Sequence, residues 1–187
     1  MRPKIENRVD VINYFIRKYK YKSYLEIGYL AGETFDAIKC KHKDSVDIDP
    51  KTHAKYIMSS DRFFRQCKRK YDLIFIDGNH DQRYVGRDIR NALKHWAKKG
   101  TIVLHDCNPP TARWQAWNGT VWRAILYLRR RCEWLVIRTI DIDHGIGIIR
   151  RGYTKRYLKE IKTFEDFDAE RKYVLRLITP NQFLRLY

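Results

Sequence analysis

At 187 residues the chain has the length of one ordinary domain, with a core large enough to be stable without disulfides or a structural metal, and we expect no second domain. The four cysteines, at positions 40, 67, 107 and 132, form no CxxC pair, which argues against a structural zinc site. We find no secretory leader, so we expect a reducing, cytoplasmic location without disulfides. No run of about 18 apolar residues is present, which argues against a membrane span. The 39 Lys and Arg against 22 Asp and Glu give a net charge of +17, but they fall in many short clusters, which favours a solvated surface over a dedicated nucleic-acid face.

The first half of the chain alternates short apolar runs with helical patterns. Apolar residues at helical spacing predict an amphipathic helix over 6–19. Beyond it, strands end at glycine, aspartate or proline, and the run from Leu73 is nearly continuous, as in a strand covered on both faces. The pattern predicts strands over 23–29, 44–50, 71–78 and 101–106, an edge strand within 52–58, and helices over 33–40 and 81–98, the last stopped by Gly100.

The second half begins with an irregular loop. Paired prolines at 109 and 110 break both helix and ladder, so we expect a loop over 107–119 at the end of a central strand. A helix over 120–131 follows, and strands over 134–140 and 146–150 form an antiparallel hairpin around a turn at 141–145. A last helix is expected over about 163–177.

This order of elements predicts an α/β fold. We expect a Rossmann-like, doubly wound, mostly parallel seven-stranded sheet with a C-terminal antiparallel hairpin, in one domain over 1–187 with a helix at 6–19, a core at 20–150 and a helical tail at 151–187. In such sheets ligands bind beyond the carboxyl ends of the strands. The acidic, glycine and histidine residues expected at those ends are Glu26, Gly28, Asp47, Asp49, Asp77, His80, His105 and Asp106.

The turn after the first strand suits a ligand. Gly28 and Gly32 lack Cβ atoms and let a ligand approach the backbone and the following helix N-terminus. Glu26 would repel a pyrophosphate, so a ligand bearing a cation or hydroxyls fits better than a dinucleotide. Asp47 or Asp49, about 20 residues further on, is the expected acceptor for ribose hydroxyls, which indicates an adenosine-containing ligand. The alternative is a tight turn that needs glycine, with solvated acids.

Two carboxylates are expected at the ends of neighbouring central strands. Asp77 and Asp106, brought close, either share a proton or hold a cation. Oxygen ligands favour Mg²⁺, whereas His105 as a ligand would favour Mn²⁺ or Fe²⁺. His80 is the natural general base because imidazole exchanges protons near neutral pH. In the alternative interpretation Asp77 caps the next helix and His80 lies on the surface.

Other polar and aromatic residues are less informative. The rings of Trp114, Trp117 and Trp122 could stack on a sugar or a base, but core packing is the better explanation for each. Asp88, near the apolar stripe of its helix, is interpreted as a hydrogen-bonded structural residue. The remaining histidines have no partner at a useful spacing and are taken as bystanders: His42, His53, His95 and His144.

Over residues 20–150 the chain resembles the class I S-adenosylmethionine-dependent methyltransferases. Within them it is similar to the small, often metal-dependent O-methyltransferases related to the catechol and macrolide-sugar enzymes. The most specific signal is the pair "FIDGNH" and "VLHDCNPP" at this separation. The motifs that carry the resemblance are "YLEIGYLAGETF", "VDIDP", "SSDRFF", "YDLIFIDGNHDQRYVGRDIRNAL", "GTIVLHDCNPP", "WNGTVWRAI" and "DIDHGIGII".

The resemblance implies roles for individual residues. The metal-dependent relatives hold Mg²⁺ with the residues matching Asp77 and Asp106 and use the one matching His80 as base. Where some relatives have a third oxygen ligand this chain has His105, with Asn108 as a substitute. By the same resemblance, Asp47 would hold the ribose of the cofactor and Asp61 would lie beside the adenine. The full set of cofactor contacts would be Glu26, Gly28, Gly32, Thr34, Asp47, Asp61 and Asp77.

We therefore expect an S-adenosylmethionine-dependent methyltransferase that acts on a hydroxyl of a small molecule or of a sugar or glycan component, assisted by Mg²⁺ or another divalent metal. The positive charge suggests an anionic acceptor, and a homodimer would help to close the pocket. Three alternatives stay open: an RNA or DNA methyltransferase, a non-catalytic nucleotide-fold binding module, and a non-haem iron oxygenase using His80 and His105.

Overall fold

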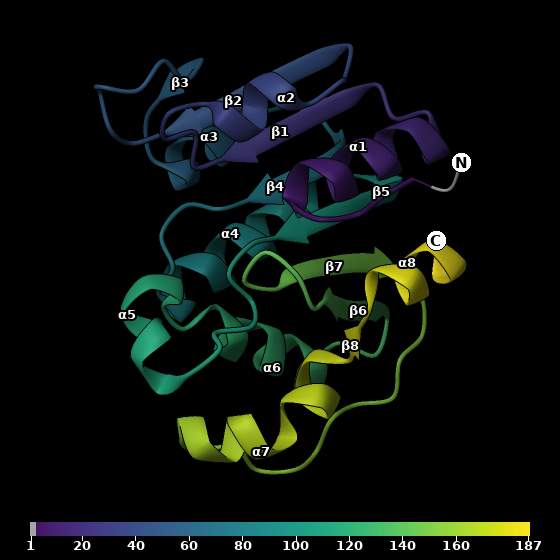
Figure 1. The fold of residues 1–187 in the computed structure, drawn as a ribbon. Coiled ribbons are helices and arrows are strands. Elements are labelled where there is room, and N and C mark those ends of the chain that lie inside the picture. The colour runs from purple at the N-terminus through teal and green to yellow at the C-terminus, as the bar shows by residue number, and fades with distance from the viewer. Residues whose placement is uncertain (1–2) are drawn as a thin grey trace.

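The computed structural model describes residues 3–187. Over these residues the strands form one eight-stranded sheet in the order β3-β2-β1-β4-β5-β7-β6-β8, in which β7 runs antiparallel to β5 and β6 (Figure 1). The strands are β1 (Ser23–Ile27), β2 (His42–Asp47), β3 (Tyr56–Ile57), β4 (Tyr71–Ile76), β5 (Trp96–Leu104), β6 (Leu135–Ile140), β7 (Ile146–Arg151) and β8 (Leu177–Ile178).

Helices cover both faces of the sheet. Because side chains alternate along a strand, Ile74 and Ile76 of β4 pack into one core and Leu73 and Phe75 into the other. The first core lies under α3, α4, α6 and α7, and the second under α1 and α8. The helices are α1 (Arg8–Tyr19), α2 (Glu33–Ala37), α3 (Ser60–Gln66), α4 (Gln82–His95), α5 (Gln115–Asn118), α6 (Val121–Arg131), α7 (Phe164–Leu175) and α8 (Pro180–Leu186).

The predicted α/β fold is confirmed, with one more strand than expected. The eighth strand is a two-residue extension, β8, that pairs in parallel with Thr139 and Ile140 at the end of β6. Helix α8 behind it was not predicted as a separate element, although Thr179 and Gln182 form a capping box at its start. None of the helices between residues 3 and 187 combines the length and apolarity that a bilayer span needs.

Three local predictions were wrong. The helix expected to run to Lys98 ends at His95, because Trp96 pairs with Tyr71 and starts β5. Gly100 does not stop a helix: it lies inside β5 beside a register shift, where a Cβ would come within 2.8 Å of the Asp72 carbonyl oxygen. The loop over 107–119 contains a 3₁₀ turn (Ala112–Trp114) and α5, and α3 was not predicted as a helix.

The carboxyl ends of β1, β2, β4 and β5 meet at one edge of the sheet, since these strands are paired in parallel. The prolyl loop and α5 lie at this edge (Figure 1). The opposite edge holds the amino ends of the same strands.

Candidate active site

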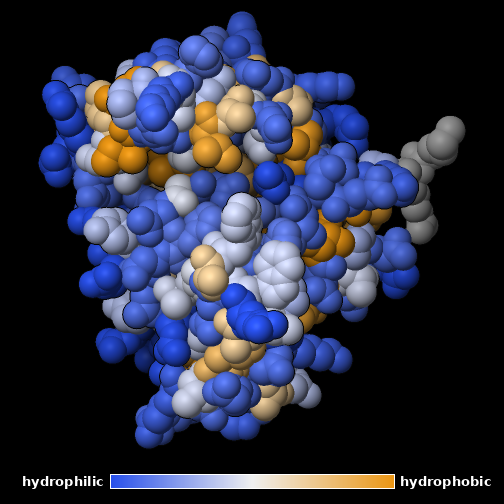
Figure 2. Space-filling model, turned by 60° about the vertical axis from the view of Figure 1, so that its left-hand side comes forward, coloured by the Kyte–Doolittle hydropathy of each residue, from blue (hydrophilic) through white to orange (hydrophobic). Residues whose placement is uncertain are grey.

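A cleft of about 840 Å³ opens at the carboxyl edge. Figure 2 shows the molecule from the left-hand side of Figure 1, with hydrophobic residues gathered in the upper part of an otherwise mainly hydrophilic face. The cleft is lined by all ten residues that the sequence singled out for cofactor, metal or catalysis: Glu26, Gly28, Gly32, Thr34, Asp47, Asp61, Asp77, His80, His105 and Asp106.

The turn after β1 requires its first glycine. Gly28 has a φ of 92°, and a Cβ there would collide with the main chain of Asp77 and Gly78, which follow the adjacent strand β4. Its N–H donates to the carbonyl of Val46 in β2 (2.9 Å), so the turn is held between two neighbouring strands. Gly32 (φ 82°) forms the second bend and the N-cap of α2. Both glycines line the cleft, and the space that a Cβ would need is filled by the main chain of Asp77 and Gly78 at the first and by the ring of Tyr29 at the second.

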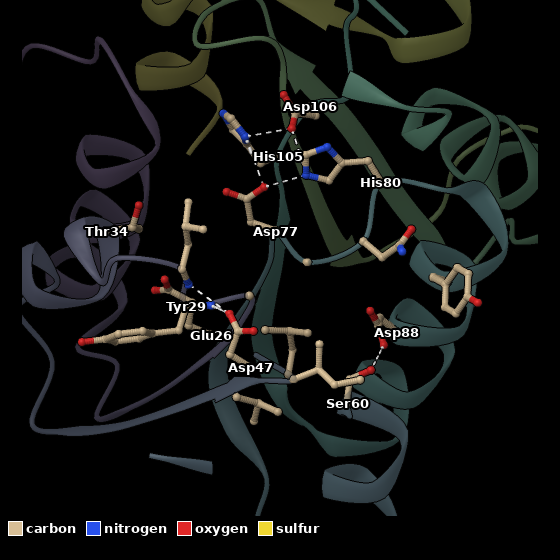
Figure 3. Close-up of a pocket in the computed structure, with 18 of the residues that line it drawn as sticks. Glu26, Tyr29, Thr34, Asp47, Ser60, Asp77, His80, Asp88, His105 and Asp106 are labelled. Atoms are coloured by element: carbon tan, nitrogen blue, oxygen red, sulfur yellow. Dashed lines mark hydrogen bonds and ion pairs between the residues drawn. The ribbon is translucent and has the colours of Figure 1, made fainter. Parts of the chain in front are cut away.

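Asp47 braces this turn from the end of β2. Its Oδ2 accepts hydrogen bonds from the main-chain N–H groups of Tyr29 (2.8 Å) and Leu30 (3.0 Å), as Figure 3 shows. Its Oδ1 accepts from the N–H of Asp49 (2.9 Å). Asp49 is exposed and not part of the cleft, so the structure separates the two acids between which the sequence could not choose.

Glu26 lies almost completely buried below the glycine turn, with 1% of its surface exposed. Burial raises the pKa of its carboxyl to about 8, although the hydroxyl of Tyr24 donates a hydrogen bond to it. In the free protein this side chain is therefore mainly protonated at neutral pH. A cation bound beside it would favour the carboxylate.

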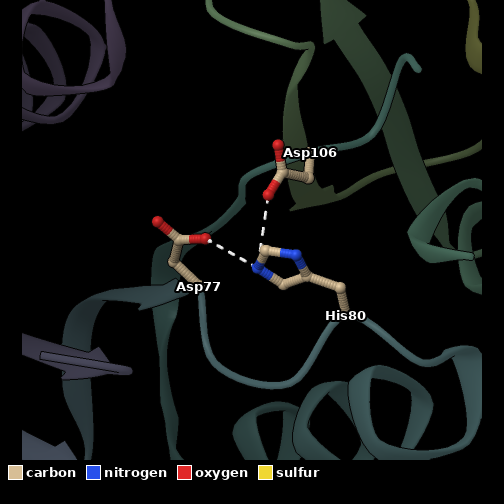
Figure 4. Close-up of side chains that lie close together, drawn as sticks. All are labelled: Asp77, His80 and Asp106. Atoms are coloured by element: carbon tan, nitrogen blue, oxygen red, sulfur yellow. Dashed lines mark ion pairs between the residues drawn. The ribbon is translucent and has the colours of Figure 1, made fainter. Parts of the chain in front are cut away.

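His80 stands between two carboxylates at the ends of β4 and β5 (Figure 4). Its Nε2 lies 3.5 Å from Oδ1 of Asp77 and 3.2 Å from Oδ2 of Asp106. Its Nδ1 lies 2.7 Å from the carbonyl oxygen of Trp117 and must carry a proton there, because a carbonyl only accepts. The hydrogen bond with Asp77, opposed by desolvation, raises the pKa of His80 above its ordinary value.

His105 bridges three carboxylates from the buried end of β5. Its Nδ1 lies 3.4 Å from oxygens of both Asp77 and Asp106, and its Nε2 lies 3.2 Å from Asp143 (Figure 3 shows the first two). Burial alone would lower its pKa, but these carboxylates raise the pKa to about 11. Burial likewise opposes ionisation of Asp77, yet the hydrogen bonds from His105 and His80 hold the pKa of that carboxyl well below its usual range.

Among residues 3–187, one group of three His, Cys, Asp or Glu side chains offers metal-ligand atoms within 4.8 Å of one another, namely Asp77, His80 and Asp106. The buried Asp106 also accepts a hydrogen bond from Asn118, which orients its carboxylate. Asn108, expected as a substitute oxygen ligand, does not join them. Its amide donates to Asp141 (2.8 Å) and accepts from Arg171 (2.6 Å), because the turn at 141–145 and α7 pack against it.

Sequence reasoning missed Arg8 and Asp143. Arg8, the first residue of α1, donates from Nε to Thr34 Oγ1 (3.0 Å) and pairs through a guanidinium nitrogen with Asp143 (3.1 Å). Asp143 comes from the turn between β6 and β7. The turn "DIDHG" was a visible signal for Asp143. No pattern in the N-terminal helix marks Arg8 as a site residue.

The three loop tryptophans have different environments. Trp122 is fully buried and stacks on Phe167, with 4.2 Å between ring centroids, so its interpretation as a core residue is confirmed. Trp117 is 70% exposed and lines the cleft, and Trp114 is 43% exposed beside His144, so core packing is wrong for both. His144 itself lines the cleft instead of being a bystander.

The adenine-side candidates also lie in the cleft. Asp61 pairs with Arg87 (3.0 Å) and accepts from Asn91 (3.0 Å). Asp88 accepts from the hydroxyl of Ser60, in line with its interpretation as a hydrogen-bonded residue, although it lines the cleft as well. Burial raises the pKa of Asp88 to about 6.

The comparisons with known proteins agree with this geometry. Residues 25–107 match the family model of a methyltransferase domain. A comparison with curated protein sequences gave no match. The solved structure of the methyltransferase PaMTH1 from Podospora anserina, bound to S-adenosylhomocysteine, is 14% identical with a TM-score of 0.60, over 78% of this chain and 78% of that chain.

Two further structures have the same fold. The O-methyltransferase TomG from Streptomyces achromogenes, involved in tomaymycin synthesis and solved with S-adenosylmethionine, is 12% identical with a TM-score of 0.58, over 77% of this chain and 79% of that chain. The methyltransferase MycE of the mycinamycin pathway, solved with Mg, S-adenosylhomocysteine and mycinamycin VI, is 15% identical with a TM-score of 0.51, over 81% of this chain but 50% of that chain. Residues 25–107 therefore match a methyltransferase domain, and the chain shares the fold of these solved methyltransferases.

Proposed function

We propose that the chain is an O-methyltransferase that transfers the methyl group of S-adenosylmethionine to a hydroxyl of a small molecule or sugar component. The observation that carries this proposal is the single cleft in which the open turn at Gly28 lies beside the carboxylate-flanked imidazole of His80. One end of the cleft can hold a nucleoside, and the other can remove a proton.

The cofactor is placed along the cleft by the chemistry of its parts. Gly28, Gly32 and Thr34 line the place of the methionine part at the start of α2, with Glu26 below it as the partner of the ammonium group. Asp47 is the ribose partner and Asp61 lies beside the adenine. The sulfonium methyl then lies near Asp77.

The transfer is an in-line displacement at the methyl carbon. The acceptor oxygen forms the new bond to carbon as the carbon–sulfur bond breaks, and sulfur keeps the electron pair as a thioether. The acceptor proton goes to Nε2 of His80, while the hydrogen bond from Nδ1 to Trp117 fixes the tautomer. Asp77 and Asp106 stabilise the imidazolium that forms, and orientation of the two reactants would supply on the order of 7 kcal/mol.

A divalent cation fits the residues present. Asp77 and Asp106 would hold it, because their carboxylate oxygens gather at one point beside Nε2 of His80. That nitrogen stays free to accept the proton, since Nδ1 already donates to the carbonyl of Trp117. A bound cation would lower the pKa of the acceptor hydroxyl. Carboxylate oxygens suit Mg²⁺ and Mn²⁺. His105 is a weaker ligand because both of its ring nitrogens already lie against carboxylates, Nδ1 against Asp77 and Asp106 and Nε2 against Asp143.

The cleft favours an uncharged acceptor over an anionic one. Its lining holds eight Asp and Glu side chains but only two Arg and no Lys. A polyanion would therefore be repelled from the reacting edge, which argues against methylation of nucleic acid within the cleft. The exposed ring of Trp117 offers a flat face for a catechol or a sugar.

Calorimetry with S-adenosylmethionine, with and without Mg²⁺ or Mn²⁺, tests the cofactor part of this proposal. A methyl-transfer screen over catechols and sugars, with the variant His80→Ala as control, tests the rest. Absence of cofactor binding would overturn the whole proposal, whereas binding together with transfer to nitrogen or carbon acceptors alone would overturn the choice of a hydroxyl.

A further inference from the structure

The fold collects the scattered basic clusters of the sequence at the edge of the sheet opposite the cleft. Parallel strands all begin at one edge, so segments that precede them meet there even when they are far apart in the chain. The register pairs Ser23 with His42, Tyr71 with Trp96 and Leu135 with Arg151 at this edge. We call the segments 17–22, 39–41, 68–70, 98–99, 131 and 150–156 the basic edge.

Contacts between these segments show that they are neighbours. The N–H of His42 donates to the carbonyl of Lys22 (3.0 Å), and the hydroxyl of Tyr21 donates to the carbonyl of Lys99 (2.7 Å). The guanidinium of Arg151 lies 4.6 Å from the ring of Trp96. The segments follow the strand order β2-β1-β4-β5-β7-β6, so at about 4.8 Å per strand the basic edge spans about 24 Å.

The charge of the molecule is thereby divided between two edges. The basic edge holds 16 Lys and Arg side chains and no Asp or Glu. Nearby acids are already engaged: Asp44 pairs with Lys55 and Arg69, and Glu133 pairs with Arg156. The cleft at the other edge is lined mainly by carboxylates. A polyanion would thus be drawn to the side of the molecule that does not carry the reacting groups.

The basic edge also carries exposed aromatic rings. A hollow of about 600 Å³ is lined by Arg131, Glu133, Trp134, Gly152, Tyr153 and Arg156. The side chains of Trp134 and Tyr153 are 48% and 76% exposed, and the guanidinium of Arg151 lies 5.8 Å from the ring of Trp134. Exposed rings set among cations are the combination on which unpaired bases stack while the phosphates meet positive charge.

We infer that the basic edge binds single-stranded nucleic acid, with the phosphates along the lysine and arginine clusters and bases on Trp134 and Tyr153. A duplex would present its phosphates but keep its bases away from these rings. The nucleic acid is a partner and not the methyl acceptor, because the cleft opens at the opposite edge. This inference does not depend on the acceptor proposed above.

Fluorescence anisotropy with a labelled 20-nucleotide oligo(U) tests the inference on the full chain. We expect binding whose affinity falls with salt, with a log–log slope of about −0.7 per phosphate contact. A variant with Lys68, Lys70, Lys98 and Lys99 each replaced by Glu is expected to bind at least a hundred-fold more weakly. The matched control replaces Lys51, Arg62, Lys162 and Lys172 by Glu, an equal change in charge outside the basic edge, and is expected to lose less than about ten-fold.

Two aromatic variants separate nucleic acid from other polyanions. Trp134→Ala and Tyr153→Ala leave the charge unchanged and are each expected to weaken oligo(U) binding about ten-fold, while heparin binding stays the same. Circular dichroism checks that every variant is folded. Any of four results would overturn the inference: no binding at 100 mM salt, equal losses for the two charge variants, unchanged oligo(U) affinity of both aromatic variants, or a preference for duplex or for phosphatidylserine vesicles.

Discussion

Nε2 of His80 lies 3.2 Å from Oδ2 of Asp106, although the two residues follow different strands and one of them is buried. The other ring nitrogen, Nδ1, donates a hydrogen bond to the carbonyl oxygen of Trp117. The ring can therefore exchange a proton only on the side that faces Asp77, Asp106 and the cleft.

Replacing His80 by Ala should lower kcat by about 10²- to 10⁴-fold, the usual contribution of a general base, while the Kd for S-adenosylmethionine stays nearly unchanged. Steady-state rates and calorimetry measure the two effects separately. Ser60→Ala, another change in the lining of the cleft, is the control and should keep most of kcat. If cofactor affinity fell as far as kcat, His80 would have a structural role instead.

The rate of the wild-type protein should rise with pH through an inflection above 6.5. The hydrogen bond with Asp77 raises the pKa of His80, so the imidazole keeps its second proton to a higher pH than a free histidine. The neutral imidazole, which acts as the base, therefore forms only above the ordinary histidine pKa of 6.5. A pH profile of kcat measures the inflection. The variant His80→Asn should lose it, and a profile that keeps the same inflection in this variant would assign the base to another group.

Gly28→Ala should prevent cofactor binding and lower the stability of the fold. A Cβ at this position collides with the main chain after β4, and the positive φ of 92° is unfavourable for alanine. Gly86→Ala is the matched control, because that glycine lies inside α4, where a Cβ would make an ordinary contact of 3.8 Å with the Arg90 guanidinium, and the substitution should stabilise the fold by up to about 1 kcal/mol. Denaturant unfolding and calorimetry with the cofactor compare them. Normal stability and cofactor binding of Gly28→Ala would contradict the tight packing of this turn against the main chain after β4.

Glu26→Gln should make stability less dependent on pH. The raised pKa of about 8 means that the folded state holds a proton that the unfolded state loses above about 4.5. Between these values the folded state binds more protons, so its stability falls as pH rises, by at most about 1.4 kcal/mol per pH unit. Urea unfolding at pH 5.5 and 7.5 measures the difference. The exposed Glu33→Gln should behave as wild type, and an equal pH dependence in Glu26→Gln would refute the prediction.

Arg8→Ala should weaken S-adenosylmethionine binding about ten-fold or more, which is the usual effect of losing a hydrogen bond to a charged group. Among residues 3–187, Arg8 and Arg87 are the two arginines that line the cleft, and Arg8 is the one in contact with Thr34. It is therefore placed to receive the carboxylate of the methionine part. Calorimetry with Arg17→Ala, a change at the far end of the same helix, provides the control. Unchanged affinity in Arg8→Ala would remove it from the cofactor site.

Asp106→Asn should abolish any stimulation by Mg²⁺ or Mn²⁺ while cofactor binding remains. The substitution removes one of the three converging donors but keeps the size of the side chain. Metal titrations followed by calorimetry, and rates before and after treatment with a chelator, measure the effect. If neither chelator nor added metal changes the wild-type rate, no metal takes part in the reaction. The carboxylates of Asp77 and Asp106 would then interact only with the imidazoles of His80 and His105.

Much of the fold was readable because its signals are local. Apolar runs predicted β1, β2 and β4, and the rule that parallel strands end at one edge predicted that Glu26, Asp47 and Asp77 would share a site. The start of β5 was missed because Trp96 continues the apolar stripe of α4, and only its pairing with Tyr71 makes it a strand residue.

The sequence by itself determined which acidic, glycine and histidine residues stand at the carboxyl ends of the strands, because hydrophobic periodicity and turn residues act over a few positions. The tertiary structure alone decided how these residues are paired. Arg8 reaches Asp143 across 135 positions, and the basic clusters meet at the edge away from the cleft. Such contacts depend on how the whole chain winds through the sheet, and no local pattern of residues specifies them.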